Sequence, residues 1–387
     1  MSLESKKKIL ILATTASMIA QFNMHNIKIL KKLGFEVHVG TNFKKPGTIP
    51  NNLSKNLVAT LNKMNVPYHQ IDFPRGIGTH KINRKVLKQV CTVIKNYGIS
   101  GIHAHSPLGG IIGRRAAHKM KIKILYTAHG FQFFKGGPIR DWLIFFPVEW
   151  FYARWTDALI TINQDDYQAS RFLPVSRRYY IPGVGINFDN TVSTFRKKQL
   201  RDQTRKKLSV KSDEYLLISV GELSKRKNHE TVLRAIARLN NTKIKYVIAG
   251  IGKEKDRLIK LISELGLQKQ VLLLGYLEDL DGLYYAADLN VFVSKREGLG
   301  LGGLDGVVHG VYMIGNANTG MKDYILNNDI GLLVKSPTDS NELAQKIQLA
   351  MNSKRKAKLN KQIQKFSQKN VDKLMTNIYK KEFFSYE

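Results

Sequence analysis

Cysteine is almost absent from this sequence: Cys91 is the only one among 387 residues. A single thiol excludes any disulfide within the chain, which is typical of proteins of a reducing compartment. The first residues imitate an export signal, because three lysines at 6–8 precede the apolar residues 9–13. A buried first strand with a basic entry is the preferred interpretation of this segment. Together, the two observations predict a cytoplasmic protein.

Acidic residues are also scarce, with 30 Asp and Glu against 62 Lys and Arg, so the formal net charge is +32. Such a charge requires an anionic partner, which can be nucleic acid, membrane lipid or a phosphorylated ligand. An anionic lipid surface attracts nearby Lys and Arg residues at roughly 1 kcal/mol each. No nucleic-acid motif or aromatic-interleaved basic stripe is present. We therefore expect a protein that binds peripherally at the inner membrane face and does not bind nucleic acid.

The sequence lacks any hydrophobic run long enough to span a bilayer. The most apolar segment, residues 142–155, is too short and is interrupted by Pro147, Glu149 and Arg154. It contains all three tryptophans of the chain. A helix packed under a loop is the preferred interpretation, and a patch that meets lipid is the alternative, since Trp and Tyr favour the membrane interface.

Strand-like and helix-like segments alternate along nearly the whole chain. A first series of apolar runs lies at 8–13, 35–40, 68–73, 101–103, 122–127 and 157–162, and a second at 215–221, 244–249, 271–274, 289–294, 311–315 and 331–334. This alternation predicts parallel sheets with helices on both faces, in two doubly wound domains. The predicted domains are 1–186 and 214–365, joined by a basic linker at 187–213. Residues 354–386 have no strand character and are predicted to be helical.

The glycine-rich stretch 294–306 places two carboxylates, Glu297 and Asp305, on either side of four glycines. It follows a predicted buried strand and leads into a predicted short helix. A turn of this kind exposes backbone N–H groups at a helix N-terminus, where anions bind. Carboxylates repel phosphate but accept hydrogen bonds from hydroxyl groups. The combination indicates a ligand with both phosphate and sugar, namely a nucleotide sugar.

Two other turns follow predicted strands of the second domain. After Gly221 and Glu222 come three consecutive cations, ending at Lys227, and a predicted helix starts near Asn228. Cations at such a turn can neutralise a diphosphate. The turn 249–252 reads Ala-Gly-Ile-Gly and lacks the third glycine of a dinucleotide-binding fingerprint. That absence argues against a nicotinamide-dependent enzyme.

Histidines follow two predicted strands of the first domain. His103 and His105 precede Ser106, the predicted cap of the next helix, and His129 ends the following strand. A lone histidine is more often structural than catalytic, but two such strand ends indicate a site. No carboxylate or cysteine lies at metal-ligand spacing from these histidines, so no metal is expected.

Taken together, these segments resemble the retaining family 4 glycosyltransferases of the GT-B fold, and most closely the bacterial members that build capsules and exopolysaccharides. The resemblance covers nearly the whole chain. Its more specific parts are residues 102–110, 126–130, 156–167, 180–185, 220–228 and 294–301.

The resemblance implies two Rossmann-like domains that face each other across a cleft, with a last helix, 366–387, returning to the first domain. The first domain would bind a lipid-linked or cell-surface glycan acceptor, near His103, His105 and Ser106. The second would bind a UDP-linked hexose or N-acetylhexosamine, which would be transferred with retention of configuration and without a metal or cofactor. The implied catalytic residues are His129 and Glu297, and the implied donor-binding residues are Glu222, Lys227, Gly298, Leu299, Gly300, Leu301 and Asp305.

The chain departs from the family pattern at two of these positions. The second acid is Asp305 where the family usually has glutamate, which shortens the side chain by one methylene, and Glu222 stands where many members have arginine. The first turn, residues 13–18, has neither glycine nor charge. An alternative function is therefore a catalytically weak or inactive binding partner in a polysaccharide assembly complex. A nucleotide-sugar 2-epimerase on the same fold is a third possibility.

Overall fold

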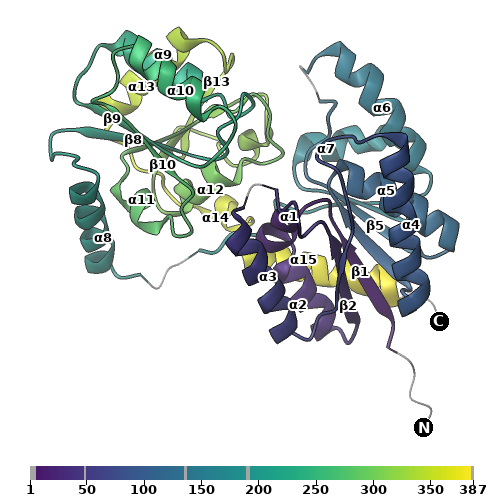
Figure 1. Ribbon diagram of the computed structural model, residues 1–387. Helices are drawn as coiled ribbons and strands as arrows, with labels where there is room; N and C mark the ends of the chain where they lie inside the picture. Colours follow the sequence, from purple (N-terminus) through teal and green to yellow (C-terminus); the bar gives the residue numbers. More distant parts are fainter. Residues whose placement is uncertain (1–5, 48, 135–136, 189–191, 385–387) are drawn as a thin grey trace. The chain divides into compact units, whose positions relative to one another are not determined.

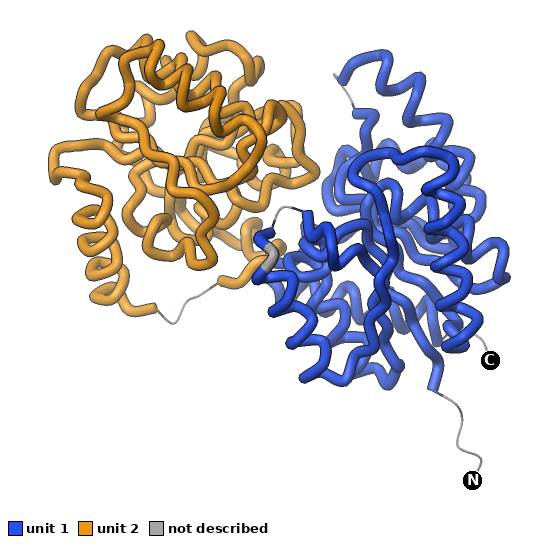
Figure 2. Tube along the Cα trace, viewed as in Figure 1, with its two compact units in different colours: residues 1–185, 368–387 blue, residues 186–367 orange. Residues whose placement is uncertain are grey.

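The computed structural model describes residues 6–47, 49–134, 137–188 and 192–384. The chain divides into two compact units, coloured separately in Figure 2. Unit 1 comprises 1–185 and 368–387, and unit 2 comprises 186–367. The chain passes from one unit to the other at 185–186 and again at 367–368. Parts of the predicted segments 187–213 and 366–387, namely 189–191 and 385–387, lie outside the described residues.

Unit 1 contains a seven-stranded sheet in the order β3-β2-β1-β4-β5-β6-β7, in which every neighbouring pair is parallel. Its strands are β1 (Lys8–Leu12), β2 (Glu36–Thr41), β3 (Tyr68–Gln70), β4 (Gly101–His105), β5 (Lys123–Ala128), β6 (Ala158–Thr161) and β7 (Arg177–Tyr180). The order reverses between β1 and β4, and ligands of such sheets bind beyond the strand ends at that point.

Helices cover both faces of this sheet (Figure 1). They are α1 (Ala16–Phe22), α2 (Met24–Lys32), α3 (Asn51–Lys63), α4 (His80–Tyr97), α5 (Pro107–Met120), α6 (Ile139–Ala153) and α7 (Gln164–Ala169), with a short η1 (Ser170–Phe172). The C-terminal elements α15 (Gln368–Tyr379) and η3 (Lys380–Phe384) belong to unit 1 as well, and α15 packs on α2. The predicted return of the last helix to the first domain is therefore confirmed.

Unit 2 contains a six-stranded parallel sheet in the order β10-β9-β8-β11-β12-β13. Its strands are β8 (Tyr215–Val220), β9 (Ile244–Ala249), β10 (Val271–Gly275), β11 (Leu289–Phe292), β12 (Tyr312–Asn316) and β13 (Gly331–Val334). Its helices are α8 (Thr194–Lys207), α9 (His229–Leu239), α10 (Lys255–Glu264), α11 (Asp281–Ala286), α12 (Leu301–Val308), α13 (Ser340–Ser353) and α14 (Lys361–Gln364), with a short η2 (Gly320–Asp323). The order reverses between β8 and β11. Two parallel, doubly wound sheets confirm the predicted fold class.

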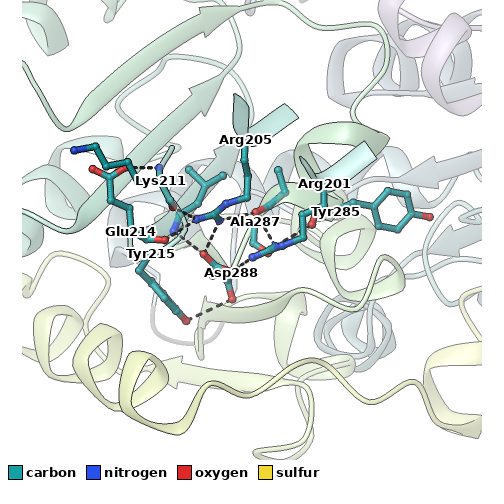
Figure 3. A network of polar contacts seen from close by, with 10 residues as sticks. Arg201, Arg205, Lys211, Glu214, Tyr215, Tyr285, Ala287 and Asp288 are labelled. Atoms are coloured by element: carbon teal, nitrogen blue, oxygen red, sulfur yellow. Dashed lines mark hydrogen bonds and ion pairs between the residues drawn. The ribbon is translucent and has the colours of Figure 1, made fainter. Parts of the chain in front are cut away.

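The stretch expected to be a linker, 187–213, contains helix α8 of unit 2. Arg201 and Arg205 of α8 bind Asp288, at 2.6 and 3.0 Å, just before β11. Arg201 also donates to the carbonyl oxygens of residues 285–287, at the end of α11. Figure 3 shows these contacts converging on Asp288. The arginines therefore hold α8 against α11 and the residue that precedes β11.

Candidate active site

The loops after β8 and β11 meet where the strand order of unit 2 reverses. Three long-range hydrogen bonds hold the first loop in place: Leu223 N–H donates to Ile251 O, Lys295 N–H to Arg226 O, and the Asn228 side-chain amide to Val293 O. Asn228 occupies the predicted cap position of α9, but its side chain makes no capping hydrogen bond. It ties the loop to the residue that follows β11 instead.

The central contact of this site joins Lys227, from the first loop, to Glu297, from the second. Lys227 Nζ and Arg226 Nη1 each lie 2.7 Å from Glu297 Oε1. Burial raises the pKa of Glu297, but Lys227 and Arg226 outweigh it, so the pKa lies below its usual value and the carboxylate is ionised. Burial also lowers the pKa of Lys227, which Glu297 partly offsets. Neither of these two ion pairs was predicted from the sequence.

The glycine-rich turn 298–301 leads directly from Glu297 into α12. Gly300 is the N-cap and has a left-handed backbone, with φ of +81°, which favours glycine. Gly303 and Leu304 N–H donate to Gly300 O. The side chain of Leu299 is buried in unit 2. The N–H groups of Leu301 and Gly302 have no acceptor among the described residues. The turn therefore directs two N–H groups away from the helix, as an anion site requires.

The remaining predicted donor residues, Asp305 and Glu222, have different surroundings. Asp305 lies on α12, with His309 Nδ1 3.7 Å from its Oδ1. Burial raises the pKa of Asp305, against the effect of His309. Glu222 is half-buried. Its Oε2 lies 4.0 Å from Arg226 Nη2, and its backbone oxygen lies 3.3 Å from His229 Nε2. The two acids of the glycine-rich stretch thus have unequal surroundings: Glu297 pairs with Lys227 and Arg226, whereas Asp305 lies beside His309.

In unit 1, His105 and His129 lie side by side at the carboxyl ends of β4 and β5. His105 Nδ1 is 3.1 Å from His129 Nε2, and both rings line a pocket with Phe22 of α1. Burial lowers the pKa of His129 to about 4, and burial together with the nearby histidines holds that of His105 well below its usual value. Both imidazoles are therefore neutral at pH 7, able to donate and accept hydrogen bonds but carrying no charge.

His103 and Ser106 are not among the residues that line this pocket. His103 is fully buried, with Nδ1 2.7 Å from the Tyr379 hydroxyl of α15 and Nε2 2.8 Å from the Thr127 hydroxyl. Ser106 occupies the predicted cap position of α5 but makes no capping hydrogen bond; its hydroxyl lies 3.1 Å from that of Thr14. Both residues hold strand ends in place rather than facing the pocket.

A second pair of interacting side chains, His25 and Asp372, lines the same pocket and was not predicted from the sequence. His25 Nδ1 of α2 lies 3.2 Å from Asp372 Oδ2 of α15, and Asp372 also accepts from the Gln368 amide at 2.6 Å. The pair is separated by 347 residues, so no local pattern could have indicated it. Among the described residues, no group of three or more His, Cys, Asp or Glu side chains is arranged to hold a metal ion.

Comparisons with known proteins match both units. The profile of "Glycosyltransferase Family 4" matches residues 22–182, and that of "Glycosyl transferases group 1" matches residues 201–370. The putative glycosyltransferase EpsD of Bacillus subtilis is 32% identical over 338 residues, which are 85% of this chain and 84% of that protein. An Escherichia coli UDP-Gal:alpha-D-GlcNAc-diphosphoundecaprenol alpha-1,3-galactosyltransferase is 25% identical over 65% of this chain and 66% of its own.

Solved structures share the fold over nearly the full length. Sucrose-phosphate synthase from Thermosynechococcus elongatus covers 98% of this chain with 100% of its own, at a TM-score of 0.77 and 20% identity. Anabaena HepE in complex with UDP and glucose covers 98% with 96% of its own, at a TM-score of 0.70 and 16% identity. With two doubly wound parallel sheets, both family profiles and a relative that matches along most of its length, the chain belongs to the family 4 glycosyltransferases of the GT-B fold.

Proposed function

We propose that the protein transfers a hexose or N-acetylhexosamine from a UDP-sugar to a lipid-linked glycan acceptor, with retention of configuration, at the inner face of the cell membrane. The product would serve the assembly of a capsule or exopolysaccharide. The observation that carries the proposal is the meeting of Lys227, Arg226 and Glu297 beside the two unpaired N–H groups of α12. Cations and free N–H groups favour a diphosphate, and the carboxylate favours sugar hydroxyls.

In the proposed reaction, the bond from the anomeric carbon to the diphosphate oxygen breaks as a bond to the acceptor oxygen forms. The acceptor proton leaves with the departing diphosphate. Lys227 and the N–H groups of Leu301 and Gly302 would stabilise the negative charge that develops on that diphosphate. Glu297 would accept hydrogen bonds from the sugar, and Asp305 from the ribose diol. We expect no metal or cofactor, because the cations of the chain itself would carry this role.

On the acceptor side, the neutral His129 would donate a hydrogen bond in the transition state. Its low pKa supports this role over that of a charged acid. The lipid-linked acceptor is proposed because the Escherichia coli relative is named for a diphosphoundecaprenol substrate. The UDP donor is proposed because that relative is named for UDP-Gal and HepE was solved with UDP.

The proposal is tested with Lys227→Met and Glu297→Gln in the full chain, assayed for release of UDP and for transfer to membrane extract. We expect each to reduce turnover by roughly 100-fold or more, as for the loss of one preorganised group that stabilises the transition state. Lys225→Met is the matched control, because this exposed lysine lies two residues away in the same loop. Undiminished turnover in both test variants would refute the proposed site.

A second candidate function, a binding partner without turnover, is favoured by one observation. Asp305, whose side chain is one methylene shorter than the usual glutamate, lies in surroundings where burial raises its pKa. Calorimetry with a panel of nucleotide sugars separates the two functions. Donor binding that Asp305→Glu converts into turnover would support the second function for the natural chain. Turnover by the unmodified protein would exclude it.

A further inference from the structure

Helix α6 of unit 1 exposes a row of large apolar side chains. Ile139 is 78% exposed and Leu143 72%. Farther along the helix, Ile144, Val148, Trp150 and Phe151 are also exposed. Monomeric proteins rarely expose contiguous apolar patches, and large ones mark interaction sites. The preferred prediction for residues 142–155, a helix packed under a loop, therefore describes only one side of α6.

The other side of α6 is firmly attached to unit 1. Glu149 is buried and binds the fully buried Arg114 of α5, with N–O distances of 2.5 and 3.2 Å. Trp142 and Phe146 pack against Phe133 in the core of the unit. Removing either partner of a buried ion pair is costly, so the pair fixes which side of the helix faces outward. The apolar row therefore lies on the side of α6 that faces away from the core of unit 1.

The charge around this row is positive. Arg140 and Arg154 are exposed near the two ends of α6, and the guanidinium of Arg154 lies over the rings of Trp150 and Phe151, at 4.8 and 4.7 Å. Neither acid of the helix is exposed, because Glu149 is buried and Asp141 half-buried.

Further cations lie beside the C-terminal end of α6. Trp155, just after the helix, stacks on His118 of α5, with ring centroids 4.4 Å apart. His118 is followed in the chain by the exposed Lys119 and Lys121. An apolar row with aromatic residues and surrounding cations complements the headgroup layer of an anionic bilayer, where aromatic rings and basic side chains are both stable.

We propose that α6 lies flat in the headgroup layer of an anionic membrane, with Ile139 and Leu143 inserted among the acyl chains and Arg140 and Arg154 among lipid phosphates. The proposal rests on the proposed function in one respect, because a lipid-linked acceptor resides in such a membrane. Interfacial insertion, and not a membrane span, fits the helices of the structure. No helix of the described residues is both long and apolar enough to cross a bilayer.

The test measures co-sedimentation of the full chain with vesicles of phosphatidylcholine, with and without phosphatidylglycerol. We expect I139E/L143E to lose roughly tenfold or more of its partitioning onto anionic vesicles, since charged side chains are unfavourable at apolar membrane positions. The matched control is I77E/F172E, because Ile77 and Phe172 are equally exposed apolar residues of unit 1, at 75% and 70%. Circular dichroism and UDP-sugar hydrolysis in solution verify that both variants are folded.

Equal partitioning of the two double variants would overturn the proposal, as would binding of the unmodified chain to neutral and anionic vesicles alike. Sedimentation velocity adds a further check: a dimer that I139E/L143E dissociates would show that a second copy covers this face instead. Vesicle binding requires no sugar donor. Its failure is therefore distinguishable from a failure of the proposed transferase activity.

Discussion

At the scale of single residues, the turns after β8 and β9 depend on glycines at positions where one backbone segment contacts another. A Cβ on Gly250 would lie 1.9 Å from Gly221 O, and one on Gly252 would lie 2.3 Å from Leu223 O. The glycines of the Ala-Gly-Ile-Gly turn therefore let the β9 turn support the β8 loop that carries Lys227. This packing role explains the two glycines of the turn without a bound dinucleotide, whose fingerprint would require a third glycine.

We expect Gly250→Ala to destabilise unit 2 by about 1–3 kcal/mol, because the added methyl group has no room beside a backbone carbonyl. All three tryptophans lie in unit 1, so far-UV circular dichroism in urea follows both units while tryptophan fluorescence follows unit 1 alone. The circular dichroism transition should shift to lower urea while the fluorescence midpoint stays. Gly266→Ala is the control, with a left-handed φ of +70° but no neighbour within 4 Å. A larger loss in Gly266→Ala than in Gly250→Ala would contradict the packing argument.

At the scale of elements, the sequence predicted buried strands well and polar elements poorly. The interior strands β8, β9 and β11 were predicted at or within two residues of their observed bounds, because each is a short apolar run. The edge strand β7 was missed, since its residues Arg177–Tyr180 are only half-buried and form no such run. Helix α8 was missed for a related reason: it is held by arginines and has almost no apolar periodicity.

The arginine contacts of α8 provide a prediction at this scale. Arg205→Met should destabilise unit 2 by about 3 kcal/mol, because Asp288 and the carbonyl groups of residues 211 and 214 lose a largely buried donor. Arg196→Met on the exposed side of the same helix is the control, since the Arg196 side chain donates to Gln199, one turn farther along the same helix. Urea unfolding followed by circular dichroism measures both variants. Equal midpoints would show that the network of Figure 3 adds nothing to stability.

At the scale of the whole molecule, buried histidines couple stability to pH. Burial lowers the pKa to about 3 for His103 and to about 4 for His129 and His229. An unfolded chain takes up protons on these residues near pH 6.5, whereas the folded protein does so only at the lower values. Their contribution to stability is therefore complete above about pH 6.5 and is lost as the pH falls toward 4 and below.

We accordingly expect the free energy of unfolding to fall between about pH 6.5 and about pH 4, when urea unfolding is followed by tryptophan fluorescence for unit 1. His103→Gln should reduce that slope, because it removes one of the buried groups that must ionise. His80→Gln on an exposed helix end is the control and should leave the slope unchanged. A stability that is independent of pH over this range would contradict the neutral state of the buried histidines.

The amino-acid sequence by itself determined the alternation of strands and helices, the two parallel sheets and the chemical types at the strand ends, including Lys227, Glu297 and His129. Those features are local, because the hydrophobic pattern of a few consecutive residues is enough to indicate a buried strand or an exposed turn. The tertiary structure alone decided which strand ends are neighbours. It brought Lys227 to Glu297 across the β8–β11 reversal, moved His103 into the core beside α15, and placed His25 against Asp372. Each of these contacts depends on packing between segments far apart in the chain, which no local pattern encodes.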